Sequence, residues 1–122
     1  HCYDLLESGG KIWIQTPNNQ SFGHNIFGKN WRGLEPPRHL VIFNKSSIKK
    51  ALKNVGFKRV HFINSVDPSK RTFSASFAIS REISPYSNFR TPFKFDIFAF
   101  LSKFASKLFT NKSEFITVIA EK

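Results

Sequence analysis

The stretch LLESGGKIWIQTPN, residues 5–18, determines the first structural unit of the chain. Its first three residues are the end of a helix predicted over Cys2–Glu7. Gly9 and Gly10 terminate this helix, because glycine readily adopts the left-handed backbone found after helices. The KIWIQ run predicts a strand over Lys11–Gln15 with Ile12 and Ile14 on one face, and the strand ends near Pro17 because proline cannot donate to a ladder. A helix, a glycine turn and a strand in this order are typical of α/β folds.

Apolar periodicity and turn residues predict the remaining elements. In chain order we expect a long loop at 20–43 with a short helix at 21–28, a helix at 44–55, a strand at 58–65, a helix at 94–109 and a strand at 114–120. Phe73–Ile79 fits either a short helix or a strand, and 84–91 fits a loop. Asn44 or Ser46 would cap the helix at 44–55. The length is that of one domain with one modest core.

Charge and cysteine content limit the classes of partner. The chain has 19 basic and 8 acidic residues, a formal charge of +11, which favours phosphates, nucleotide-linked substrates, acidic lipid surfaces or nucleic acid. The single Cys2 excludes an internal disulfide and a multi-cysteine zinc site and favours a reducing compartment. No apolar run is long enough to span a bilayer. A cytoplasmic location is therefore expected, with peripheral contact at the inner face of the membrane as an addition to it.

Three segments, in this order, resemble one protein family. LLESGGKIWIQTPN (5–18), SFGHNIFGKNWRGLEPPRHLVIF (21–43) and SSIKKALKNVGF (46–57) are similar to a strand, a Trp-x-Gly-x-x-Pro-Pro-Arg-His-Leu segment and the following helix of class I S-adenosylmethionine-dependent methyltransferases from a broad bacterial group. The apolar helix and the SEFITVIAEK tail are similar to the end of that fold. The resemblance covers nearly the whole chain, and WRGLEPPRHL is its most specific part.

The resemblance implies a Rossmann-like sheet of seven strands with helices on both faces. Lys11–Gln15, Lys58–Ser65 and Glu114–Ala120 would be strands five, six and seven, with the seventh antiparallel between the other two. Residues 1–122 would then be a partial domain, the C-terminal half without the half that binds S-adenosylmethionine. We expect this fragment alone to be inactive, and its exposed strand 11–15 to pair with a second copy.

Four residues are candidates for the site, each with a structural alternative. His39 would be a general base that deprotonates a substrate hydroxyl, or a histidine bonded to a loop carbonyl. Arg38 would bind an anionic group of the substrate or pair with Glu35. Trp31 would form a wall of the acceptor pocket or anchor the loop in the core. Asn18 would face the site or form an Asx turn.

No cofactor-binding or metal-binding residue is predicted in the fragment. His24 and His61 are predicted to be exposed polar residues.

The expected function is the acceptor side of a methyltransferase that acts on a small-molecule, sugar or lipid-linked acceptor, with an anionic acceptor favoured by the charge. The alternative is a non-catalytic basic module that binds nucleic acid or an anionic membrane. Nucleic acid is disfavoured because the basic residues are scattered and no binding motif is present. The Phe-rich helix at 94–109 would either contact a membrane or pack on the sheet beside the last strand.

Overall fold

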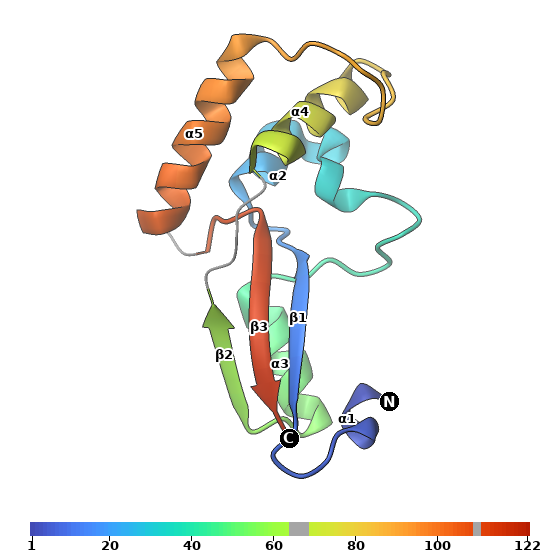
Figure 1. Cartoon of the computed structure of the whole chain (residues 1–122), viewed down its shortest axis with the longest axis vertical. Coiled ribbons are helices and arrows are strands. Elements are labelled where there is room, and N and C mark those ends of the chain that lie inside the picture. Colours follow the sequence, from blue (N-terminus) through green and yellow to red (C-terminus); the bar gives the residue numbers. More distant parts are fainter. Residues whose placement is uncertain (64–68, 109–110) are drawn as a thin grey trace.

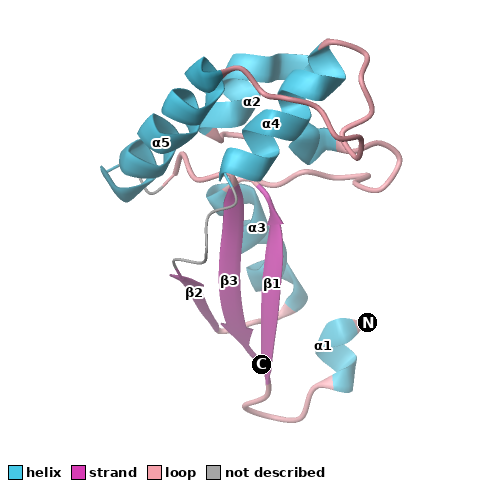
Figure 2. Ribbon diagram, turned by 45° about the horizontal axis from the view of Figure 1, so that its top comes forward, coloured by secondary structure: helices cyan, strands magenta, loops and turns pink. Residues whose placement is uncertain are grey.

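The computed structural model describes residues 1–63, 69–108 and 111–122. A three-stranded sheet carries α3 against one face, and a group of helices lies at one end of the strands (Figures 1 and 2). The elements in chain order are α1 (Cys2–Leu5), β1 (Lys11–Pro17), α2 (Phe22–Phe27), the 3-10 turns η1 (Gly28–Asn30) and η2 (Arg32–Leu34), α3 (Lys45–Val55), β2 (Arg59–Ile63), α4 (Ser69–Ser80), α5 (Phe93–Leu108) and β3 (Phe115–Glu121). The predicted strand residues 64–65 and the predicted helix end at 109 lie outside the described residues.

The last strand lies between the other two, as predicted. The order is β1–β3–β2, and β3 runs antiparallel to both neighbours, so β1 and β2 run in the same direction. The pairing runs from Lys11 opposite Glu121 to Pro17 opposite Phe115. β1 is two residues longer than predicted, because a proline at the last position of a strand leaves the inner ladder bonds intact.

One hydrophobic core joins α3 to the sheet. Ile48 and Leu52 of α3 pack with β3 residues Ile116 and Val118 in a buried cluster, and half-buried apolar residues of β1 and β2 surround it. β1 alternates half-buried and exposed residues, as its sequence predicted. The side chains of Asn44 and Ser47 each bond the other's backbone N–H, so Asn44 is the cap of α3 and the alternative, Ser46, was wrong.

The helical group is held together by small polar residues and by phenylalanine rings. The segment that fitted a helix or a strand forms α4, which buries Phe73 and Ala78 together with Ser69, Thr72 and Ser76. The Phe95 ring of α5 lies 4.6 Å from the Phe77 ring and 5.7 Å from the Phe27 ring. The expectation that this helix packs on the sheet beside the last strand was wrong: its described contacts are with α2 and α4, and Figures 1 and 2 place it beyond the end of the strands.

The predicted end of the first helix also needs correction. α1 ends at Leu5, two residues before the predicted Glu7, because Leu6 already has an extended backbone with ψ of 141°. The Gly10 N–H donates to the Glu7 carbonyl, so the Gly-Gly pair forms a turn after the helix has ended. Within the described residues, no helix combines the length and the apolar character needed to cross a bilayer.

Candidate functional site

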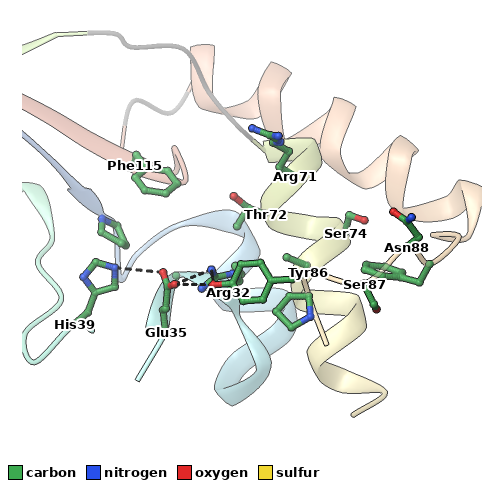
Figure 3. Close-up of a pocket in the computed structure, with 15 residues that line it drawn as sticks. Arg32, Glu35, His39, Arg71, Thr72, Ser74, Tyr86, Ser87, Asn88 and Phe115 are labelled. Carbon is green, nitrogen blue, oxygen red and sulfur yellow. Dashed lines mark hydrogen bonds and ion pairs between the residues drawn. The ribbon is translucent and has the colours of Figure 1, made fainter. Parts of the chain in front are cut away.

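A pocket of about 600 Å³ opens at the carboxyl end of β1, between that strand, the segment after α2, and α4 (Figure 3). β1 contributes Pro17 and β3 contributes the neighbouring Phe115, so the floor of the pocket is the paired end of two strands. The other walls come from the η2 segment, from α4 and from the α4–α5 loop: Arg32, Gly33, Glu35, His39, Arg71, Thr72, Ser74, Ala75, Pro85, Tyr86, Ser87, Asn88 and Phe89.

A buried carboxylate fixes the segment that carries the η2 wall. Glu114, fully buried just before β3, accepts the Gly23 N–H at 2.7 Å on one oxygen and the Trp31 indole N–H at 2.8 Å on the other. The Trp31 ring lies against Gly33, where a Cβ atom would come within 2.3 Å of the ring. The segment from α2 to η2 is therefore tied to the central strand by two charge-assisted hydrogen bonds.

Asn18 ties the same region to the chain before β3. Its side-chain amide donates to the carbonyls of Asn111 and Ser113, both at 2.8 Å, and its Oδ1 accepts the Gln20 N–H at 3.1 Å. These are the contacts of the alternative prediction, an Asx turn, with a long-range anchor added. Asn18 does not line the pocket in the described part of the chain, so its role in substrate binding stays a prediction.

Arg32 and Glu35 form an ion pair at the pocket wall (Figure 3), and Arg38 joins the same carboxylate. Arg32 Nη2 lies 2.7 Å and Arg38 Nη1 3.0 Å from Glu35 Oε1. The hydrogen bond from Arg32 lowers the pKa of Glu35 below its usual range, with the charges of both arginines adding to the effect and partial burial opposing it. The same hydrogen bond raises the pKa of Arg32 further. Glu35 is therefore ionised, and Arg38 makes the structural pairing that was its alternative role.

His39 is the predicted site residue that the structure places in the pocket. Its ring is about one-quarter exposed, and Nε2 lies 3.9 Å from Glu35 Oε2, on the oxygen that Arg32 and Arg38 leave open. In Figure 3 the ring and the Glu35 carboxylate face each other at one side of the pocket, and Arg71, Thr72 and Ser74 of α4 lie at the other. The Glu35 carboxylate therefore lies beside the imidazole, at a distance beyond that of a hydrogen bond.

The other predictions have mixed outcomes. Trp31 is buried and bonded to Glu114, which is the core-anchor alternative, and its role as a pocket wall stays a prediction. The prediction that His24 is exposed was wrong: the ring is half-buried, stacks on Trp31 at 4.9 Å, and places Nδ1 2.6 Å from the Asn19 carbonyl. His61 is exposed, as predicted.

Sequence reasoning missed the α4 side of the pocket. Arg71, Thr72 and Ser74 lie in the segment whose secondary structure was left open, and the Tyr86–Phe89 stretch lies in a predicted loop. Arg71 is exposed and makes no ion pair within the described part of the chain. A count of polar residues at helical spacing would have been the signal for this wall, because Ser69, Thr72 and Ser76 repeat every three or four residues.

The described residues do not fit an adenosyl cofactor. The backbone N–H groups at the start of α2, which follows β1, are already bonded: Gly23 donates to Glu114 and His24 to the Ser21 hydroxyl. The carboxylate in the pocket is held by two arginines, and the 122 residues contain no Gly-x-Gly-x-x-Gly pattern. Among the described residues, no group of three His, Cys, Asp or Glu side chains could hold a metal ion.

The fold is an α/β domain with an antiparallel last strand, and its pocket lies at the carboxyl end of a strand. A family model described as "Methyltransferase domain" matches residues 1–62, half of the chain, and the chain belongs to that family. The match runs from α1 to β2 and includes His39, while α4 and the α4–α5 loop lie outside it. Searches of curated proteins and of solved structures gave no match.

Proposed function

We propose that the chain forms the acceptor side of an S-adenosylmethionine-dependent methyltransferase, and that residues outside this sequence hold the cofactor. The observation that supports this most is the position of His39, which lies in the family-matched part of the chain and borders a pocket at the carboxyl end of β1. Ligands of open α/β sheets bind at this end of the strands. The reaction class given by the family is methyl transfer, and the site suits an acceptor hydroxyl.

The strand order supports the assignment of β1, β2 and β3 as strands five, six and seven of the family's sheet. β3 lies antiparallel between two strands that run in the same direction, as that assignment requires. In the described residues β1 pairs along one edge only, with β3. On this assignment the other edge pairs with the fourth strand of the whole sheet, and a second copy would occupy it only where that strand is lacking.

His39 would act by accepting the proton of the acceptor hydroxyl. The hydroxyl oxygen then becomes the nucleophile, and the proton passes to an imidazole nitrogen. Glu35, kept ionised by Arg32, lies 3.9 Å from Nε2, so a negative charge stands beside the ring. The ion pair between Arg32 and Glu35 holds that carboxylate in place before the acceptor arrives.

The α4 wall indicates the class of acceptor. Arg71 supplies a guanidinium without an ion-pair partner among the described residues, next to the hydroxyls of Thr72 and Ser74. Tyr86 and Phe89 add aromatic surface at the loop side. This combination suits an acceptor that carries several hydroxyls and one anionic group, such as a uronic acid, a sugar phosphate or a phosphate-linked lipid headgroup.

The base is tested with the full-length protein, labelled S-adenosylmethionine and a panel of uronic acids, sugar phosphates and their neutral parent sugars. His39→Gln is expected to lower kcat by about 10²–10⁴-fold with little change in KM, because the pocket keeps its shape while the base is lost. The matched control is His61→Gln, which changes an exposed histidine of β2. Unchanged turnover in His39→Gln, on an acceptor that is methylated at oxygen, would contradict the role of His39.

The acceptor class is tested with Arg71→Gln. We expect KM to rise about tenfold for the anionic acceptors and to stay constant for the neutral parent sugars, because only the anionic group contacts the guanidinium. Arg81→Gln is the control, since Arg81 is an exposed arginine at the end of the same helix that lies over the Phe77 ring and away from the pocket. Equal effects of the two substitutions would refute the assignment of Arg71.

A further inference from the structure

α5 has apolar residues on two faces, and only one of them is packed. The packed face includes the half-buried Phe95 and the buried Ala99 and Ser102. The second face, called here the α5 stripe, consists of an apolar residue at position 93 and four more that follow it by 4, 7, 8 and 11 positions, as one side of a helix requires. Its members and exposed fractions are Phe93 76%, Ile97 46%, Phe100 70%, Leu101 48% and Phe104 59%.

The α5 stripe lies at the outer side of the helical group. Figures 1 and 2 show α2 and α4 along one side of α5 and no other described element along the opposite side. Lys70 of α4 also pairs with Asp96 of α5 at 3.2 Å, a surface contact between the two helices. The packed face sets the rotation of α5, and the α5 stripe therefore faces outward. An exposed apolar patch of this kind indicates an interaction surface.

Charge decides what covers the stripe. The α4–α5 region, residues 69–108, has seven basic and two acidic residues, and the whole chain has a formal charge of +11. The exposed Arg81, Arg90 and Lys94 belong to this region. A second copy would bring the same positive charge to the contact, which opposes association, whereas anionic lipid headgroups attract it. Nucleic acid would match the charge but not a stripe of five large apolar side chains.

We propose that α5 docks on an anionic membrane surface, with the α5 stripe inserted at the boundary between headgroups and acyl chains. Aromatic and leucine side chains on one face of a helix, with lysine and arginine beside them, are the pattern of helices that lie in this interface. The α4–α5 loop lines the pocket through Tyr86–Phe89, so docking of α5 brings the pocket to the level of the headgroups. The docking itself does not depend on which reaction the pocket performs.

The experiment is co-sedimentation of the full-length protein with two kinds of vesicle, phosphatidylcholine alone and phosphatidylcholine with about one-third phosphatidylglycerol. We expect binding to the anionic vesicles, weak binding to the neutral ones, and loss of most binding at 1 M salt, where charges are screened beyond about 3 Å. The double variant Phe100→Ser/Phe104→Ser is expected to bind the anionic vesicles at least about tenfold more weakly.

The matched control is Leu5→Ser/Val55→Ser, which removes two exposed apolar side chains from α1 and α3, at the opposite end of the molecule from α5 (Figure 1). Retained vesicle binding by this variant, together with the loss in Phe100→Ser/Phe104→Ser, supports the proposal. Circular dichroism checks that both variants are folded. Equal loss in both variants, or no binding of the parent protein to anionic vesicles, overturns it. A dimer in sedimentation velocity that Phe100→Ser/Phe104→Ser dissociates would assign the stripe to a second copy instead.

Discussion

Glu114→Gln is expected to destabilise the fold by about 2 kcal/mol and to loosen the segment that carries the pocket wall. The wild-type side chain is fully buried, and its two oxygens accept one N–H each, from Gly23 and from the Trp31 indole. Glutamine has almost the same shape but only one acceptor oxygen. Whichever way the amide is turned, its NH₂ group faces one of the two N–H donors.

The magnitude follows from that mismatch. A hydrogen bond to a charged group contributes about 1.5–3 kcal/mol net, and a buried donor left without an acceptor costs about 1–3 kcal/mol. A neutral amide is less costly to bury than a carboxylate, and this offsets part of the loss. The difference leaves about 2 kcal/mol, which would move the midpoint of a urea transition by about 1 M if the slope is near 2 kcal/mol/M.

The assay is urea unfolding of the full-length protein, with hydrogen exchange of the peptide covering residues 22–34 as a local readout. Glu121→Gln is the control, because it makes the same change at the end of β3, the strand that Glu114 directly precedes. Glu121 is partly exposed and pairs with Lys11 at 3.9 Å and Arg59 at 3.3 Å, and such surface pairs contribute at most about 1 kcal/mol. If the two variants unfold at the same urea concentration, or if exchange in 22–34 is unchanged, the anchoring role of Glu114 is refuted.

Three further changes test other contacts of the fold. Gly33→Ala should destabilise by about 1–3 kcal/mol in urea unfolding, because the new Cβ would lie 2.3 Å from the Trp31 ring, and an unchanged midpoint would contradict the packing. Glu35→Gln should reduce the loss of stability that the wild-type protein shows between pH 7 and pH 3. The pKa of Glu35 is lower in the folded protein than in the unfolded chain, so Glu35 stabilises the fold above the unfolded pKa, and this stability is lost as the pH falls through the folded pKa. Parallel pH profiles of the two proteins would count against the Arg32 pair. Asn44→Ala should cost about 1 kcal/mol by removing the cap of α3, measured as a shift in the melting transition, and no shift would exclude the capping box.

Local patterns in the sequence predicted the sheet and α3 well. Ile12 and Ile14 of KIWIQ were predicted to share a face and are half-buried, the β-branched run in EFITVIA indicates a strand, and the Gly-Gly turn precedes the first strand. The order of the strands, however, came from the family resemblance, because alternation alone does not state which strand lies in the middle. In the structure β3 is covered on both faces, whereas β1 and β2 alternate half-buried and exposed residues, and the register of β3 against both strands gives its middle position.

Only some residues of the candidate site were predicted from the sequence, and the reason differs from the one that applies to the strands. His39 was found because its motif resembles a family pattern, but nothing local shows that Glu35 Oε2 lies 3.9 Å from its ring. Arg71 escaped prediction because α4 buries serine and threonine where most amphipathic helices bury leucine or valine, so hydrophobic periodicity gave little signal. Glu114 escaped because a buried carboxylate is rare, and its partners lie 83 and 91 residues away in the chain.

The position of the pocket follows from the way β3 returns through the sheet. Because β3 enters between β1 and β2 at their carboxyl ends, the chain just before it, Ser113 and Glu114, lies directly beneath the segment that leaves β1. Asn18 bonds Ser113 there and Trp31 bonds Glu114, so the outgoing segment is fixed at two points before it reaches His39. His39 lies 12 residues after the end of α2 and 6 residues before the start of α3, and a loop residue in such a place would otherwise be poorly held. Under the proposed function, these buried polar ties position the loop histidine that would act as the base, and the Glu114 substitution should then affect both the stability of the fold and the turnover.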